Sequence, residues 1–209
     1  KNKRVPAVLR PPFAFWYHDD NLKGDSIMPV KEKNVTLIPV GPVSPDLVDW
    51  LVEKLPQHLG VAVVAGVTIA LPKSAYNPNR KQYRGGALLA LLGELAYPQA
   101  RWLVGLVAAD CYAPDLNFIF GQARLHGREC IVALARLHPA FYGEPDDELI
   151  FRERALKEVI HELGHNWGLS HCPNATCVMH FSNRLEDTDF KGTQFCSRCS
   201  QSLETLRSS

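Results

Sequence analysis

The cysteine-rich end of the chain is the feature that most constrains its fold. Four of the six cysteines lie in residues 172–209, and everything after Gly168 is short, polar and poor in apolar side chains. Such a segment cannot build a hydrophobic core of its own, so another interaction has to supply its folding energy. Disulfides and bound metal ions are the cross-links that core-poor segments use.

The four cysteines form two closely spaced pairs, Cys172 with Cys177 and Cys196 with Cys199, and 18 residues separate the pairs. This spacing is typical of a four-thiolate zinc site, in which no coordination position stays open and the ion is structural. Two disulfides or free thiols are the alternative. We expect zinc, because nothing else in the sequence suggests export to an oxidising compartment.

A long helix is predicted directly before this segment. Residues 145–148 (PDDE) open it, since acidic side chains suit the positive end of the helix dipole, and it runs to about Trp167, with Gly168 as its stop. One apolar stripe of this helix can pack on a sheet; it consists of Leu156, Val159, Ile160, Leu163 and Trp167.

Two histidines lie on the other side of the same helix. His161 and His165 are one turn apart, and Glu158 and Glu162 lie on that side too. Imidazoles at positions i and i+4 can bind one zinc ion at about 2.0–2.1 Å, with Glu162 placed to take a proton from metal-bound water. The alternative is a pair of solvated surface histidines.

The pattern continues beyond the helix. Residues 161–171 read HELGHNWGLSH, which matches the extended metzincin motif HExxHxxGxxH at every specified position. Gly168 allows a sharp turn because glycine tolerates positive φ, and the turn returns His171 to the same metal. Three histidine ligands leave the fourth position of a tetrahedral zinc ion for water, which is typical of a catalytic site. Met179 follows where a Met-turn could lie beneath the metal.

Upstream, strand and helix patterns alternate. Strands are expected at 35–40, 61–71, 101–109, 117–121 and 130–137, the last two as a hairpin. One helix is expected to begin at Pro45 and to be ended by Pro56 with Gly60, and another is expected at 87–97, with a polar loop at 72–86. This order predicts an α/β (α+β) fold with an antiparallel element in its sheet. Cys111 and Cys130 end predicted strands and are interpreted as small buried hydrophobic residues.

Charge and hydropathy exclude other classes of protein. The 23 Lys+Arg and 22 Asp+Glu give a net charge of +1, which provides no general attraction to nucleic acid or anionic membranes. No apolar run approaches the roughly 20 residues of a membrane-spanning helix. The N-terminus begins with basic residues, but prolines and Arg10 interrupt the apolar stretch that a signal peptide needs. We therefore expect a cytoplasmic monomer without nucleic-acid or membrane partners.

The combined pattern resembles the archaemetzincin family. The shared features are the HExxHxxGxxH motif, Cys172 directly after its last histidine, the Cys-x-Met step at 177–179 and the closing Cys-x-x-Cys. The resemblance is specific over 161–199 and looser from about residue 100 onward. It implies a metzincin-like twisted mixed sheet backed by helices, an active-site helix below an edge strand, and two zinc ions, one catalytic and one structural.

The chain is accordingly divided into an N-terminal extension (1–34), a mixed core that includes the zinc-binding helix (35–168) and a C-terminal subdomain (169–209). We expect a zinc metallopeptidase that acts on peptide or protein substrates. Zinc is held by His161, His165 and His171 at the catalytic site and by Cys172, Cys177, Cys196 and Cys199 at the structural site. Glu162 serves as general base, and an edge strand, taken to be 103–109, pairs with an extended substrate.

Two alternatives belong to other classes. The first is a non-catalytic, zinc-stabilised binding protein with a vestigial site, which would have lost Glu162 or a metal ligand, and neither is lost. The second is a zinc-ribbon nucleic-acid binder, against which the absence of a basic cluster near 172–199 argues.

Overall fold

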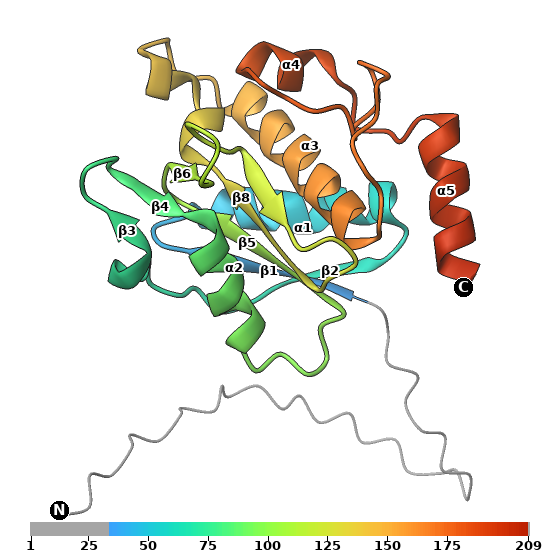
Figure 1. The fold of residues 1–209 in the computed structure, drawn as a ribbon, viewed down its shortest axis with the longest axis horizontal. Coiled ribbons are helices and arrows are strands. Elements are labelled where there is room, and N and C mark those ends of the chain that lie inside the picture. Colours follow the sequence, from blue (N-terminus) through green and yellow to red (C-terminus); the bar gives the residue numbers. More distant parts are fainter. Residues whose placement is uncertain (1–33, 209) are drawn as a thin grey trace, which may run out of the picture. The chain divides into compact units, whose positions relative to one another are not determined.

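The computed structural model describes residues 34–208, so the N-terminal extension lies outside the described residues apart from Asn34. A five-stranded sheet in the order β2-β1-β5-β8-β7 forms the centre of this part of the chain (Figure 1). Its strands are β1 (Asn34–Val40), β2 (Ala62–Ala65), β5 (Trp102–Val107), β7 (Gly121–Ala123) and β8 (Glu129–Ala133). The first four in the order pair in parallel, and β7 runs antiparallel to β8.

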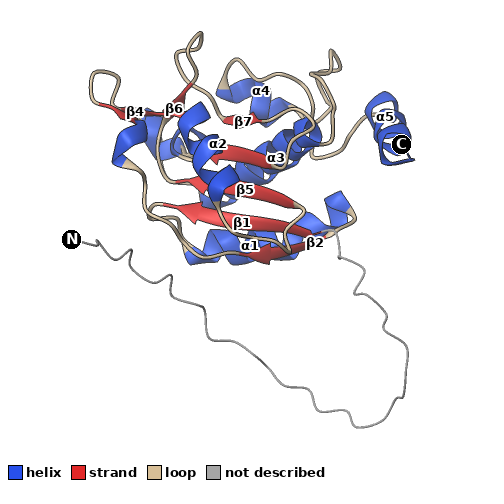
Figure 2. Cartoon of the chain, turned by 60° about the horizontal axis from the view of Figure 1, so that its bottom comes forward, coloured by secondary structure: helices blue, strands red, loops and turns tan. Residues whose placement is uncertain are grey.

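Helices cover both faces of the sheet (Figure 2). They are α1 (Pro45–Leu59) and α3 (Glu148–Asn166) on one face and α2 (Gly85–Glu94) on the other. Alternate side chains of β5 point to opposite faces of the sheet. Val104 and Leu106 pack with α1 and α3, while Leu103 and Val107 pack with α2. A parallel sheet buried on both faces explains why the strand patterns are almost continuously apolar. The expected mixed α/β fold is confirmed.

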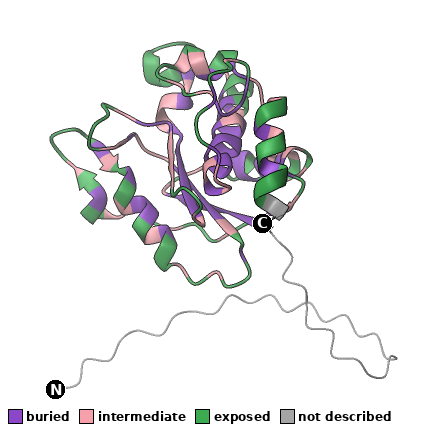
Figure 3. Cartoon of the chain, turned by 45° about the vertical axis from the view of Figure 1, so that its right-hand side comes forward, coloured by how far each residue is buried: buried purple, intermediate pink, exposed green. Residues whose placement is uncertain are grey.

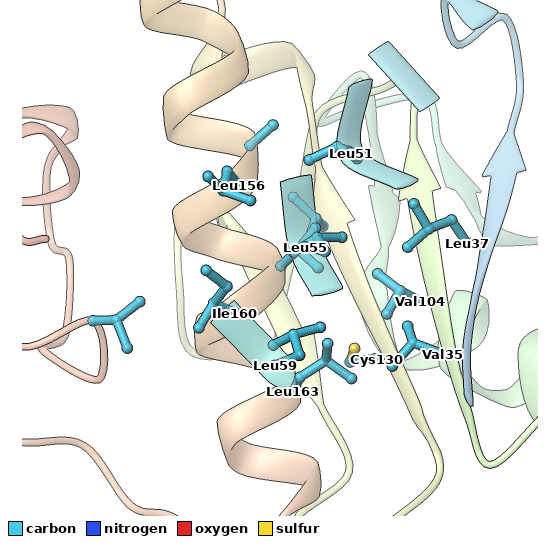
Figure 4. Packing of buried hydrophobic residues seen from close by; sticks show 14 of the residues in the cluster. Val35, Leu37, Leu51, Leu55, Leu59, Val104, Cys130, Leu156, Ile160 and Leu163 are labelled. Carbon is cyan, nitrogen blue, oxygen red and sulfur yellow. The ribbon is translucent and has the colours of Figure 1, made fainter. Parts of the chain in front are cut away.

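The core on the α1–α3 face holds the active-site helix in place. Figure 4 shows the leucines of α1 and the apolar stripe of α3 meeting over the sheet. Residues of the cysteine-rich segment, among them Val178 and Met179, join the same cluster. The tail therefore does not form a separate core but packs on the main one.

Several element boundaries differ from those expected. Helix α1 passes through Pro56 and continues to Leu59, and Gly60 ends it as expected; Gly60 is in the left-handed conformation (φ 66°), and its N–H donates to Pro56 O. The strand expected at 61–71 is reduced to β2, because beyond Gly66 the chain makes only scattered backbone bonds to β1. The expected hairpin is present as β7 and β8, and β7 lies two to four residues later than the pattern indicated.

Short elements escaped the sequence patterns. The expected polar loop at 72–86 contains most of a second sheet, in the order β3-β4-β6. Its strands are β3 (Tyr76–Asn77), β4 (Gln82–Arg84) and β6 (Cys111–Tyr112), and the tail carries the helices α4 (Leu185–Phe190) and α5 (Ser197–Ser208). Strands of two or three residues and polar helices show no hydrophobic periodicity that a sequence could reveal.

The expectation that 103–109 forms an edge strand is wrong. β5 lies in the middle of the sheet, between β1 and β8, and the edge strand beside α3 is β7. β1 pairs with one side of β5, and the parallel strand β8 pairs with the other side. β7, which forms the hairpin with β8, therefore lies at the edge of the sheet. Within residues 34–208, no helix is long and apolar enough to cross a membrane.

Candidate active site and metal centres

Helix α3 carries the first part of the candidate site. Asp147 caps its N-terminus by accepting a hydrogen bond from Ile150 N–H at 3.0 Å. At the other end Gly168 has φ 97°, and Leu169 N–H donates to Gly164 O, so the chain turns sharply where the sequence predicted a turn. Most of α3 is buried (Figure 3). The buried residues include Glu158, His161 and Glu162, which lie on the side opposite the apolar stripe.

The turn brings three imidazoles together. His165 Nε2 lies 3.2 Å from Nε2 of His161 and 3.2 Å from Nε2 of His171. Two nitrogens bound to one tetrahedral zinc ion at about 2.0–2.1 Å lie about 3.3 Å apart, so the spacing fits this metal. The histidines come from α3 and from the segment after it, as the motif predicted.

Hydrogen bonds orient two of these rings. Nδ1–H of His161 donates to Val178 O, and Nδ1–H of His165 donates to Leu169 O, both at 2.7 Å. Each bond leaves the lone pair on Nε2, the atom that faces the other histidines. Burial lowers the pKa of all three histidines, that of His171 to about 4, which favours the neutral form that binds metals.

Glu162 lies beside the three histidines and against β7. A Cβ added to Gly121 would lie 2.3 Å from Glu162 Oε1, so the strand backbone contacts the carboxylate directly. Among the described residues, Glu162 Oε2 has no hydrogen-bond partner although it is buried. Burial raises the pKa of this carboxyl well above its usual range, and the nearby Glu158 adds to the effect.

A cavity of about 460 Å³ opens onto this group. Glu162 and the three histidines form one part of its wall, β7 and the loop before it form another, and residues 181–183 form a third. Apolar side chains in the wall include Phe118, Phe120, Leu125 and Phe181. Asn166 Nδ2 fixes the β7–β8 hairpin to α3 by donating to Arg124 O and Glu129 O, each at 2.9 Å.

Met179, expected from the sequence to form a Met-turn, packs against α3 at Gly164. Its side chain is fully buried, and a Cβ added to Gly164 would lie 2.3 Å from Met179 Sδ, so the thioether packs directly on α3. The chain turns at this point, because His180 N–H donates to Cys177 O. His180 is partly buried, and its Nδ1 lies 3.0 Å from Cys172 O.

The four tail cysteines form a second group of candidate ligands. Their Sγ atoms lie within 4.8 Å of one another, and Cys172 Sγ and Cys196 Sγ are 3.7 Å apart. All six cysteines are free thiols, so the disulfide alternative is not supported. Sulfurs bound to one tetrahedral zinc ion at about 2.3 Å lie about 3.8 Å apart, which fits this cluster.

Backbone N–H groups and the guanidinium group of Arg198 contact the sulfur atoms. Cys196 N–H donates to Cys177 Sγ, and Arg198 donates to Cys172 Sγ, both at 3.3 Å. The backbone N–H of Cys199 helps to lower the pKa of Cys196 to about 7. Burial acts in the opposite direction and raises the pKa of Cys177 and of Cys199. Within the cluster, the thiolate, the form of cysteine that binds zinc, is therefore favoured at Cys196.

One backbone segment connects the two groups. Val178 accepts the hydrogen bond of His161, and its own N–H donates to Gln194 O in the tail. Cys172 N–H donates to Met179 O at 2.8 Å. The cysteine cluster thus lies at the base of the segment that orients His161.

Comparison with known proteins identifies the family. Residues 43–205 match the sequence model of peptidase family M54. The chain belongs to peptidase family M54.

Relatives in M54 cover most of this chain. The archaemetzincin of Thermococcus kodakarensis is 40% identical over an alignment of 179 residues that covers 81% of this chain and 94% of the relative. That of Methanopyrus kandleri is 44% identical over 163 residues, 78% of this chain and 89% of the relative.

Solved structures agree with this assignment. The crystal structure of the Methanopyrus kandleri archaemetzincin superposes with a TM-score of 0.78 at 36% identity, covering 88% of this chain and 99% of that one. A zinc-dependent peptidase from Methanocorpusculum labreanum gives a TM-score of 0.74 at 27% identity, covering 81% and 99%. This M54 member is a zinc metallopeptidase with a peptide or protein substrate, so the expected family and enzyme class are confirmed.

Sequence reasoning missed one residue of the M54 site. Lys191, in the tail, lies behind His161 and forms an ion pair with Glu158 at 2.9 Å. No motif spacing marks this lysine, since it meets α3 only through the fold. Cys111 and Cys130 are buried, as expected, and lie outside both groups of candidate ligands.

Proposed function

We propose that this M54 peptidase hydrolyses peptide bonds with a zinc ion held by His161, His165 and His171 and with Glu162 as general base. The observation that carries the proposal is the convergence of the three Nε2 atoms, with Nδ1 of His161 and His165 engaged by backbone carbonyls, beside a buried carboxylate. We also propose a second, structural zinc ion held by the four tail cysteines, which gives two zinc ions per chain.

The roles of the chain's own groups follow from their positions. Zinc, when bound, polarises the scissile carbonyl and makes the attacking water more acidic. Glu162 Oε2 has no partner among the described residues, so it is free to accept the proton of that water and to pass it to the leaving amine. Burial raises the pKa of this carboxyl, which makes Glu162 a stronger base for the proton of the water.

Substrate binding is assigned to β7 and the cavity. As the edge strand of the sheet, β7 can pair with an extended peptide and lead it past Glu162. The apolar side chains Phe118, Phe120, Leu125 and Phe181 suit an apolar substrate side chain in the cavity. A cytoplasmic monomer without nucleic-acid or membrane partners stays our prediction from the sequence.

The test is the substitution Glu162→Gln, which keeps the side-chain shape and removes the base. We expect hydrolysis of a peptide library to be lost while two zinc ions per chain remain by metal analysis. Glu153→Gln, at an exposed position of the same helix, is the matched control and should cleave like wild type. Hydrolysis by Glu162→Gln at the wild-type rate would show that another group is the base.

A further inference from the structure

Lys191 occupies an unusual position for a lysine. Its side chain is 1% exposed, and lysine is almost never fully buried unless it is paired. It lies in the segment between Cys177 and Cys196, where the chain returns from α4 to the cysteine cluster, and the next residue, Gly192, bonds to Thr176 O. Lys191 therefore stands between the cysteine cluster and the histidine group.

The contacts of Lys191 Nζ define its surroundings. Glu158 Oε1 lies at 2.9 Å, while His180 O and His161 Nδ1 lie at 3.5 Å. Glu158 Oε1 also accepts a hydrogen bond from Thr188 Oγ1 at 3.0 Å. The carboxylate is itself 2% exposed, so the ion pair is shielded from water.

Lys191 does not donate a hydrogen bond to the His161 ring. The hydrogen on Nδ1 of His161 is directed at Val178 O, 2.7 Å away, and two lone pairs would repel at that distance. Nδ1 is therefore a donor, as is the ammonium of Lys191. What Lys191 brings to His161 is a positive charge, placed beside the ring whose other nitrogen faces the metal position.

A positive charge at that place opposes a zinc ion unless it is compensated. Attraction and repulsion between buried charges are stronger than in water, because the surroundings have a low dielectric constant. Glu158 is the carboxylate in contact with Lys191, and it supplies the opposite charge.

We propose that Glu158 is a positioning residue for the catalytic zinc ion: it neutralises Lys191, so that this lysine can hold the returning tail segment against His161 without opposing the metal. The inference rests on the proposed role of His161 as a zinc ligand. It gives Glu158 a task distinct from that of Glu162, although both carboxylates line the same cavity.

A neighbouring ion pair provides the structural control. Arg154, one turn before Glu158 on α3, binds Asp189 through two hydrogen bonds of 2.6 and 2.8 Å. This pair also joins α3 to the tail near α4, but neither residue contacts a histidine of the site. If Glu158 and Lys191 served only to join α3 to the tail, breaking either ion pair would have the same effect on zinc binding.

The experiment measures the zinc affinity of the histidine site by competition with a chelator, on full-length protein whose cysteine site stays loaded. Glu158→Gln should weaken zinc binding about 10–100-fold, the usual effect of losing a group that supports a metal ligand. Adding Lys191→Met to Glu158→Gln should restore most of that affinity, because the uncompensated charge is then gone. Asp189→Asn should lower Tm and leave the zinc affinity as in wild type.

Each other outcome overturns the inference. If the double variant binds zinc as weakly as Glu158→Gln or more weakly, or if Asp189→Asn weakens zinc equally, the pair is only a structural tie. Should Glu158→Gln fail to fold, Lys191→Met alone decides: compensation predicts zinc affinity at or above wild type, and a structural tie predicts a loss. Wild-type protein that binds no zinc at the histidines would refute the proposed function itself, and the inference with it.

Discussion

Gly121 shows how closely β7 approaches the catalytic helix. The position of any Cβ here is already occupied by the Glu162 carboxylate, so only glycine allows strand and carboxylate to touch. The contact lies at an edge strand, where a larger residue would otherwise be tolerated. At the scale of single residues, the position of Glu162, the proposed general base, therefore depends on the lack of a side chain at residue 121.

The substitution Gly121→Ala should displace Glu162 without removing a metal ligand. Because a misplacement of about 1 Å can cost about 100-fold in rate, we expect kcat/KM to fall by about that factor with zinc content unchanged. The control is Gly86→Ala in α2, where an added Cβ meets nothing within 4 Å. Unchanged peptide hydrolysis by Gly121→Ala would mean that Glu162 can move aside without loss.

The two cysteines outside the zinc cluster should be chemically inert. Burial raises the pKa of Cys111 to about 12 and that of Cys130 well above its usual value, so both stay protonated near neutral pH. Iodoacetamide at pH 8 should therefore modify neither in the folded protein and both after unfolding, as measured by mass spectrometry of peptides. Rapid labelling of Cys130 in the native state would contradict its complete burial.

At the scale of elements, the sequence predicts best what is local. The three histidines follow from the motif because one helix and one turn position them, and helix geometry places residues i and i+4 on one face. The position of β5 could not be deduced, since which strand lies at an edge depends on pairing between distant segments. Lys191 was missed for the same reason: 30 residues separate it from His161.

The cap of α3 offers a test at this scale. Asp147→Ala removes the hydrogen bond to Ile150 N–H, so we expect a loss of about 0.5–2 kcal/mol in the free energy of unfolding, measured by urea denaturation. Activity per zinc-loaded molecule should stay as in wild type, because the cap lies at the opposite end of the helix from His165. Asp146→Ala, at an exposed neighbour whose ion pair with His138 should contribute little, is the control.

At the scale of the whole molecule, backbone hydrogen bonds in the tail connect the two proposed metal centres. The Val178 backbone bonds to both His161 and Gln194, and Met179 bonds to Cys172, so the cysteine cluster holds the segment that orients a histidine ligand. The adjacency of His171 and Cys172 in the sequence is one connection between the two groups. The structure adds a second route through the carbonyl of Val178.

Cys199→Ser should therefore affect both sites. Loss of one thiolate weakens the structural zinc, whose binding is part of the folding free energy. We expect zinc affinity at the histidines and peptide hydrolysis to fall by about 10-fold or more, although Cys199 is remote from them in sequence. Ser200→Ala, at the adjacent position, is the control. A soluble Cys199→Ser protein with normal zinc affinity and activity would show that the two centres are independent.

The placement of the cysteine cluster also sets an order of events during synthesis. The chain emerges from the ribosome with the HExxHxxGxxH segment ahead of Cys196 and Cys199, so a nascent chain holds all three histidines before the tail that supports Val178 is complete. If the proposed coupling holds, zinc binding at the histidines reaches full strength only after Cys196 and Cys199 have been synthesised.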